Sequence, residues 1–254
     1  LQGAAFTLTL TAIGTLLGVG LGIVGGILRA WRIRPFDRIF GVYVELIRNT
    51  PFIVQLFFIF FGLPSLGVRL SEWEAAVLAM VINLGAYSTE IIRAGIQAIP
   101  HGQLEAASAL AMSRFETFRH VVLRPALAKV WPALSSQIII VMLGSAVCSQ
   151  ISTEELSFAA NFIQSRNFRA FETYIVVGLL YLALSFVVRW AFWGFGMLVF
   201  TRRRKLGTAF ADPGILAGGV LRNRPQFVEA TLHAREFGFQ RAYCILHAHV
   251  ECHR

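Results

Sequence analysis

Long apolar stretches without any Asp, Glu, Lys or Arg alternate with short charged segments along this chain. The charge-free stretches cover residues 1–28, 49–68, 75–89, 130–153 and 173–188. A helix needs about 20 mostly apolar residues to cross a bilayer, and the first, second and fourth stretches have this length. The third stretch reaches this length if Glu90 lies near the end of the span, and the fifth if Arg189 lies within the span. The pattern therefore predicts an all-α integral membrane protein with five transmembrane helices.

The composition agrees with a bilayer rather than water as the surroundings. Hydrophobic residues make up 56% of the chain and charged residues 15%, whereas charged residues are about 25% of an ordinary soluble domain. A large soluble helical core, the alternative, would need polar faces that interrupt the apolar stretches. The net charge of +9 is also found in nucleic-acid-binding domains, but here the basic residues gather at the span ends. We therefore expect membrane lipid headgroups, and no nucleic acid, as partners of the basic segments.

The distribution of basic residues predicts the orientation, because Lys and Arg close to span ends stay on the cytoplasmic side. Residues 29–38 carry four Arg against one Asp, residues 101–129 carry four cations against two Glu, and residues 201–205 carry four cations and no acid. Residues 64–74 and 153–172 hold more acids than bases. We expect the N-terminus outside, the C-terminus inside, and residues 101–129 in the cytoplasm.

A row of glycines marks one face of the first span. Gly14, Gly18, Gly22 and Gly26 recur at every fourth position. Such rows of small residues let helices approach closely in lipid, where packing replaces the hydrophobic driving force. The row predicts a helix contact, either within this chain or with a second copy, and both stay open. Cys148, in the fourth span, is expected to be a small core residue.

Polar residues lie in or next to the second and third spans. Pro51 removes a backbone donor and favours a kink in the second span. Polar groups at membrane depth usually face a cavity or a polar partner, so a translocation path and simple helix–helix hydrogen bonds are both open. We expect Arg189 to reach the membrane surface rather than to pair with Glu90. The candidates for a substrate path are Arg48, Thr50, Gln55, Asn83, Tyr87 and Glu90. Glu154 and Glu155 are second-rank candidates, because loop acids usually face water instead.

A charged segment between the third and fourth spans is predicted to form one amphipathic helix over about residues 103–122. Pro100 and Gly102 end the preceding helix, and Glu105 falls in the first turn of the new one, where the helix dipole favours an anion. Leu104, Ala107, Ala111, Phe115, Phe118 and Val122 recur at intervals of three and four and form one apolar stripe. Such a helix can lie on the bilayer surface or dock into a groove of a soluble partner.

Three sequence runs resemble a known family. Glu105, Ala106 and Ala107, followed by Ala111 and by Arg114 and Phe115, resemble the EAA loop of ATP-binding cassette (ABC) importer permeases. That family usually has Gly where this chain has Ala111, and Pro at the position of Arg124, one residue before Pro125. RNTPFIVQLFFIFFGLP and AYSTEIIRAGIQAIPHGQLEAA resemble runs in permeases for polar amino acids, the histidine, glutamine, arginine and opine importers. The resemblance covers roughly residues 3–205.

The resemblance implies a multi-pass permease subunit in the bacterial inner (plasma) membrane. Such a subunit moves a polar amino acid into the cytoplasm by alternating access. Its coupling helix, here with Glu105, Ala106, Ala107, Ala111, Arg114 and Phe115, would bind a cytoplasmic ATPase dimer that holds ATP and Mg. The other implied partners are a second permease subunit, identical or similar, and an extracytoplasmic amino-acid-binding protein.

The chain itself is expected to have no enzymatic role and no cofactor, because it contains no GxxxxGK[ST] phosphate loop. The alternative function is a secondary transporter or channel that is not coupled to ATP. Such transporters commonly show an internal repeat, and the sequence shows no duplication.

Residues 1–205 are expected to form the permease domain and residues 206–254 an atypical tail. The chain has no cation before residue 29, so its first segment lacks the charged start of a signal peptide and is expected to be a retained span. Because Leu1 rather than Met comes first, we expect a fragment without its true start. The tail contains Cys244, Cys252 and several His, but their spacing matches no established zinc pattern, so no metal site is expected. A disordered extension and an out-of-frame read-through both fit this composition.

Overall fold

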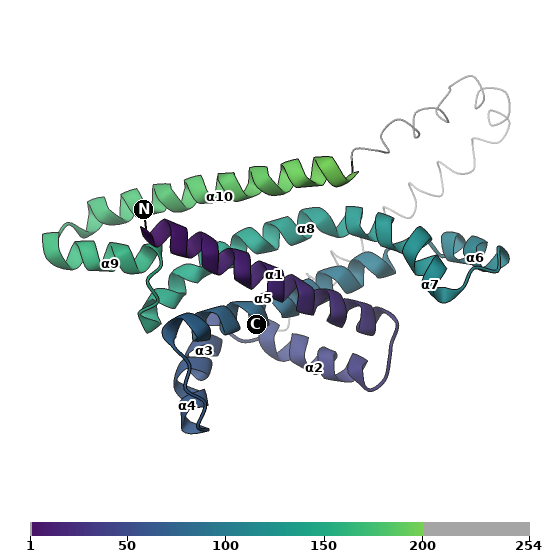
Figure 1. Ribbon diagram of the computed structural model, residues 1–254, viewed down its shortest axis with the longest axis horizontal. Helices are drawn as coiled ribbons and strands as arrows, with labels where there is room; N and C mark the ends of the chain where they lie inside the picture. The colour runs from purple at the N-terminus through teal and green to yellow at the C-terminus, as the bar shows by residue number, and fades with distance from the viewer. Residues whose placement is uncertain (1, 201–254) are drawn as a thin grey trace, which may run out of the picture. The chain divides into compact units, whose positions relative to one another are not determined.

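The computed structural model describes residues 2–200, which fold into helices joined by short connections (Figure 1). The basic cluster at 201–205 and the tail at 206–254, with Cys244 and Cys252, lie outside the described residues. The longer elements are α1 (Gln2–Ala30), α2 (Phe36–Arg48), α5 (Glu72–Gln97), α6 (His101–Ala109), α8 (Leu123–Gly144), α9 (Leu156–Asn167) and α10 (Ala170–Phe200). The shorter ones are α3 (Phe52–Phe57), α4 (Leu63–Ser65) and α7 (Arg114–Glu116), the π-helical turns η1 (Phe58–Gly62) and η2 (Thr117–Val122), and the 3-10 helix η3 (Ser145–Ile151).

Four helical segments in the described part of the chain are long and apolar enough to cross a membrane. They are Gln2–Ala30, Glu72–Gln97, Arg114–Ile151 and Ala170–Leu198. A fifth candidate is the pair Phe36–Arg48 and Phe52–Ser65, which is bent by 110°. The all-helical membrane fold is thus confirmed, with four spans or five if the bent pair forms one.

The second predicted span is therefore not a continuous helix over residues 49–68. Thr50 precedes a proline and is disfavoured in the helical conformation. Pro51 itself is extended, with ψ 141°, and begins α3 as its N-cap. The kink expected from Pro51 is present as a complete break.

The glycine row of α1 packs against α5 of the same chain. A Cβ added to Gly18 would lie 3.0 Å from the Cβ of Leu84, and one added to Gly22 would lie 2.3 Å from the Cβ of Ser88. The same construction places a Cβ on Gly14 3.4 Å from Met80, and one on Gly26 2.7 Å from Ile92. The structure therefore places this contact within the chain.

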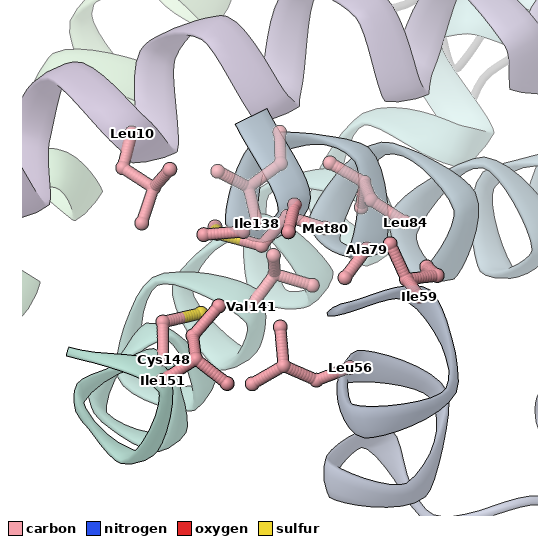
Figure 2. Packing of buried hydrophobic residues seen from close by; sticks show 12 residues of the cluster. Leu10, Leu56, Ile59, Ala79, Met80, Leu84, Ile138, Val141, Cys148 and Ile151 are labelled. Carbon is pink, nitrogen blue, oxygen red and sulfur yellow. The ribbon is translucent and has the colours of Figure 1, made fainter. Parts of the chain in front are cut away.

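The core lies where α1, α3, α5, α8 and η3 meet (Figure 2). Leu10, Leu56, Met80, Leu84 and Cys148 are fully buried there. The position expected for Cys148 is confirmed, since its fully buried side chain fills space in this core and no other cysteine lies within residues 2–200. α10 packs on α8, where the ring of Trp131 stacks on Phe195 with 5.3 Å between centroids. Most of the surface of α10 is exposed.

The amphipathic helix predicted over residues 103–122 is two helices. α6 ends at Ala109, and the chain turns at Ala111, which has a positive φ of 52°. The backbone N–H of Met112 donates to the carbonyl of Ala107 and that of Ala111 donates to Ser108, the two bonds of a Schellman motif. A new helix starts after Ser113, whose side chain and that of Glu116 form a capping box. The helix therefore ends at the left-handed turn of Ala111 and starts again after Ser113, although the apolar stripe continues through both positions.

This turn gives a prediction, because a non-glycine residue in the left-handed region is strained. Replacing Ala111 by Gly is expected to stabilise the folded state by about 0.5–1 kcal/mol, the relief of strain less the added entropy of the unfolded chain. Thermal unfolding of the full chain in detergent measures the difference. Ala106→Gly, inside α6, should have the opposite sign and cost about 1 kcal/mol. Destabilisation by both substitutions would show that Ala111 is not strained.

Candidate functional site

A cavity of about 360 Å³ lies between the end of α1, α2 and the second half of α5. Its lining residues are Arg29, Gly41, Val44, Glu45, Arg48, Asn49, Tyr87 and Glu90. α2 reaches this place because Val44 is buried and because the hydroxyl of Tyr43 donates to the carbonyl of Ile82 on α5, at 2.6 Å. The cavity brings together three of the predicted path residues, Arg48, Tyr87 and Glu90.

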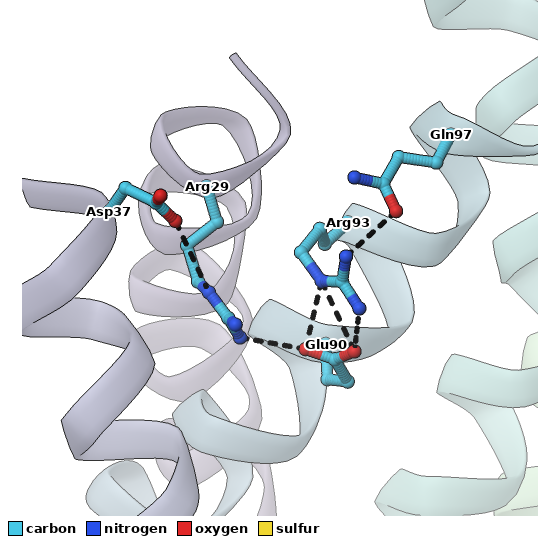
Figure 3. A network of polar contacts seen from close by, with 5 residues as sticks. All are labelled: Arg29, Asp37, Glu90, Arg93 and Gln97. Atoms are coloured by element: carbon cyan, nitrogen blue, oxygen red, sulfur yellow. Dashed lines mark hydrogen bonds and ion pairs between the residues drawn. The ribbon is translucent and has the colours of Figure 1, made fainter. Parts of the chain in front are cut away.

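Glu90 is held by two arginines at one wall of the cavity (Figure 3). Its Oε2 lies 2.7 Å from Nη1 of Arg29, and its carboxylate also accepts hydrogen bonds from Arg93 on the next turn of α5. Asp37 lies 3.8 Å from Nε of Arg29, and Nη1 of Arg93 donates to Gln97 at 2.7 Å. This network ties the end of α1 to α2 and α5, so Glu90 has its counter-charges.

Arg48 and Glu45 provide the unpaired charges of the cavity. The guanidinium of Arg48 lies over the ring of Tyr87, 5.4 Å from its centroid, a cation–π contact. Both Arg48 and Glu45 are exposed, and within residues 2–200 neither forms an ion pair. A site with one free cation and one free anion can bind a molecule that carries both charges.

Gln55, Thr50 and Asn83 form a second cluster next to the break before α3. Nε2 of the buried Gln55 donates to the carbonyl of Ile47 at 2.7 Å and to the hydroxyl of Thr50 at 2.9 Å. Its Oε1 accepts from Nδ2 of Asn83 on α5 at 3.0 Å. Both the nitrogen and the oxygen of the Gln55 amide thus hold the bent chain against α5. These three residues shape the site and do not line its cavity.

Glu155, expected as a solvated loop acid, is fully buried, whereas Glu154 is exposed. The carboxylate of Glu155 caps α9 by accepting from the backbone N–H of Phe158 at 2.9 Å, and it accepts a second hydrogen bond from Tyr181 of α10. Glu155 lies between the candidate spans, and burial raises the pKa of its carboxyl. Its partners are not cavity residues, so the structure separates both second-rank acids from the site.

Arg189 is exposed on α10, and the partners of Glu90 are Arg29 and Arg93 instead; that Arg189 reaches the membrane surface stays a prediction. Sequence reasoning missed Arg29, Glu45 and Asn49 as residues of the site. The spacing of Glu45 to Arg48 and Asn49, three and four residues, places all three on one face of a helix. This spacing is informative only if a helix over residues 36–48 is predicted first, and the hydrophobic pattern did not predict one.

The turn between α6 and α7 presents most of the predicted coupling residues at the surface. Glu105, Ala106 and Arg114 are exposed, and two large apolar side chains beside them are 76% exposed (Leu110) and 66% exposed (Phe115). Ala107 is instead buried. Large exposed apolar side chains rimmed by charges are typical of a surface that contacts a partner protein or the membrane.

Comparison with known proteins matches most of the described chain to one family. The family model described as "Binding-protein-dependent transport system inner membrane component" matches residues 18–192. The chain is 36% identical over 195 residues to the glutamine transport system permease protein of Escherichia coli (strain K12), covering 74% of this chain and 89% of that protein. It is 35% identical over 192 residues to the nopaline transport system permease protein of Agrobacterium fabrum, covering 72% and 80%. A crystal structure of an amino acid ABC transporter with histidines matches with a TM-score of 0.72 and 35% identity, over 77% of this chain and 91% of that chain.

Proposed function

Because this chain belongs to the family of inner membrane components of binding-protein-dependent transport systems, we propose that it imports a polar amino acid by alternating access, driven by a separate ATPase. The observation that carries the proposal is the cavity between α1, α2 and α5 with its unpaired Arg48 and Glu45. A zwitterionic amino acid supplies the complement of both charges. The names of the relatives, which include glutamine and nopaline permeases, support an amino-acid-type substrate.

In the proposed site, the substrate carboxylate pairs with Arg48 and the substrate ammonium pairs with Glu45. The ring of Tyr87 holds the guanidinium of Arg48 by the cation–π contact. Asn49 also lines the cavity, with its Nδ2 donating to the backbone carbonyl of Glu45. Charge-assisted hydrogen bonds are roughly twice as strong as neutral ones. The site thereby selects the backbone groups that all amino acids share, and other contacts determine which amino acid is carried.

The turn between α6 and α7 is the proposed coupling element. Leu110 and Phe115 offer apolar side chains to a groove of a cytoplasmic ATPase dimer, and Glu105 and Arg114 offer charges at its rim. The ATPase supplies ATP and Mg. A second permease subunit and an extracytoplasmic binding protein complete the assembly. The N-terminus is outside and the C-terminus inside, with α2 to α4 as the fifth, broken span.

Reconstitution into liposomes with candidate ATPase and binding proteins tests this function. We expect ATP-dependent uptake of one polar amino acid from a labelled panel, and loss of most of that uptake in Glu105→Lys, which reverses a charge of the exposed coupling surface. Glu172→Lys makes the same charge change in the first turn of α10 and should retain uptake. Uptake without ATP, or full uptake by Glu105→Lys, would favour the secondary transporter.

A further inference from the structure

The elbow between α1 and α2, defined here as residues 31–38, carries three exposed arginines without an anionic partner. Arg32, Arg34 and Arg38 are exposed, and within residues 2–200 they take part in no ion pair. The acid of the elbow, Asp37, lies beside Arg29 instead. The surface of the elbow therefore has a net positive charge that no side chain of the described chain neutralises.

An apolar stripe continues from the elbow along α2. Phe36, Ile39, Val42 and Leu46 follow at intervals of three and four, so they share one face. All four are exposed, Val42 and Leu46 by 60% each. Trp31, at the other end of the elbow, is 48% exposed. Basic residues and Trp are both enriched where a membrane segment meets the lipid headgroups, and the apolar stripe places the start of α2 beside the acyl chains.

We propose that this elbow binds the headgroups of anionic phospholipids. Arg32, Arg34 and Arg38 pair with the lipid phosphates, and the stripe on α2 contacts the acyl chains. The positive charge of the elbow favours an anionic lipid, rather than a second copy of this chain, as the partner. A two-fold contact centred on the elbow would bring the same three arginines of each copy together, and like charges repel.

The elbow is connected to both functional regions of the molecule. The ring of Trp31 packs edge to face on Phe118 of η2, with 5.2 Å between centroids, in the segment that follows the coupling turn. Arg29, two residues before Trp31, bonds Glu90 at the cavity. A lipid that holds the elbow therefore restrains α1, the cavity wall and the coupling segment together. This role is additional to the proposed transport function and does not depend on which substrate is carried.

Quenching of Trp31 fluorescence tests the proposal with the full chain in phosphatidylcholine nanodiscs. The nanodiscs contain a small, equal fraction of either brominated phosphatidylglycerol or brominated phosphatidylcholine. The signal of Trp31 is the difference between the natural chain and Trp31→Phe, which keeps an aromatic ring on Phe118. One arginine near an anionic surface changes the binding constant on the order of fivefold. We therefore expect brominated phosphatidylglycerol to quench Trp31 several-fold more than brominated phosphatidylcholine.

Two controls assign the excess quenching to the elbow. The triple variant Arg32→Gln, Arg34→Gln, Arg38→Gln should lose it, while Arg69→Gln, Arg166→Gln, Arg169→Gln, which removes three other exposed charges, should keep it. High salt should abolish it in the natural chain without any substitution. Equal quenching by both lipids, or an excess that survives the elbow substitutions, would overturn the proposal. Quenching by neither lipid would also overturn it, because Trp31 would then not lie against lipid.

Discussion

Replacing Gly22 by Val is expected to lower the free energy of unfolding by about 3 kcal/mol or more, at or above the upper end of overpacking costs. A Cβ at this position would lie 2.3 Å from the Cβ of Ser88 and 3.0 Å from its backbone carbonyl carbon. Backbone atoms inside a helix cannot move aside one by one, so α1 would have to separate from α5. Thermal unfolding of the purified chain in detergent, together with the yield of monodisperse protein, measures the effect.

Gly20→Val is the matched control on the same helix. A Cβ on Gly20 would meet nothing within 4 Å, and Gly20 is exposed. We expect this variant to melt within a few degrees of the natural chain. If both variants behaved alike, the close contact between α1 and α5 would not be what holds these helices together.

Replacing Glu90 by Gln is expected to cost about 2–3 kcal/mol and to lower the melting temperature by roughly 5–10 °C. The neutral amide would leave Arg29 and Arg93, whose side chains are 19% and 27% exposed, without their shared counter-charge. Breaking a fully buried pair costs about 3–5 kcal/mol, and the side chain of Glu90 is 24% exposed, which reduces the penalty. Thermal unfolding in detergent again gives the shift.

Glu45→Gln separates the structural role of Glu90 from the charge of the cavity. Glu45 lines the same cavity but has no ion pair in the part of the chain that the structure describes. Its substitution should change the free energy of unfolding by less than about 0.5 kcal/mol. The KM for uptake should rise, because the proposed partner of the substrate ammonium is lost. A large loss of stability in Glu45→Gln would argue against an unpaired carboxylate there.

The turn between α6 and α7 shows why the hydrophobic pattern alone did not predict the local structure correctly. The apolar stripe from Leu104 to Val122 has helical spacing throughout, so periodicity alone predicted one helix. Local signals contradict it, since Ser113 and Glu116 form a capping box that is visible in the sequence as S-x-x-E. The left-handed turn at Ala111 has no such signal, because Ala is rarely found there. Gly, which the resembling family usually has at this position, would have been such a signal.

The site was only partly predictable for a different reason. Tyr87 and Glu90 could be placed on one face of a helix because they lie on one regular element. Arg29 could not be placed beside Glu90, because 61 residues separate them and only the packing of α1 on α5 brings them together. Glu155 was misjudged because its burial depends on Tyr181, 26 residues further along.

The sequence by itself determined the membrane environment, most of the spans, the close-packed face of α1 and the family. Each of these depends on composition, on short-range spacing or on contiguous motifs. Only the tertiary structure decided the partner of the glycine row, the bend of 110° between α2 and the following helices, and the cavity with its paired Glu90 and unpaired Arg48 and Glu45. The physical reason is that electrostatic pairing and burial depend on distances between residues far apart in the chain, and helix packing sets those distances.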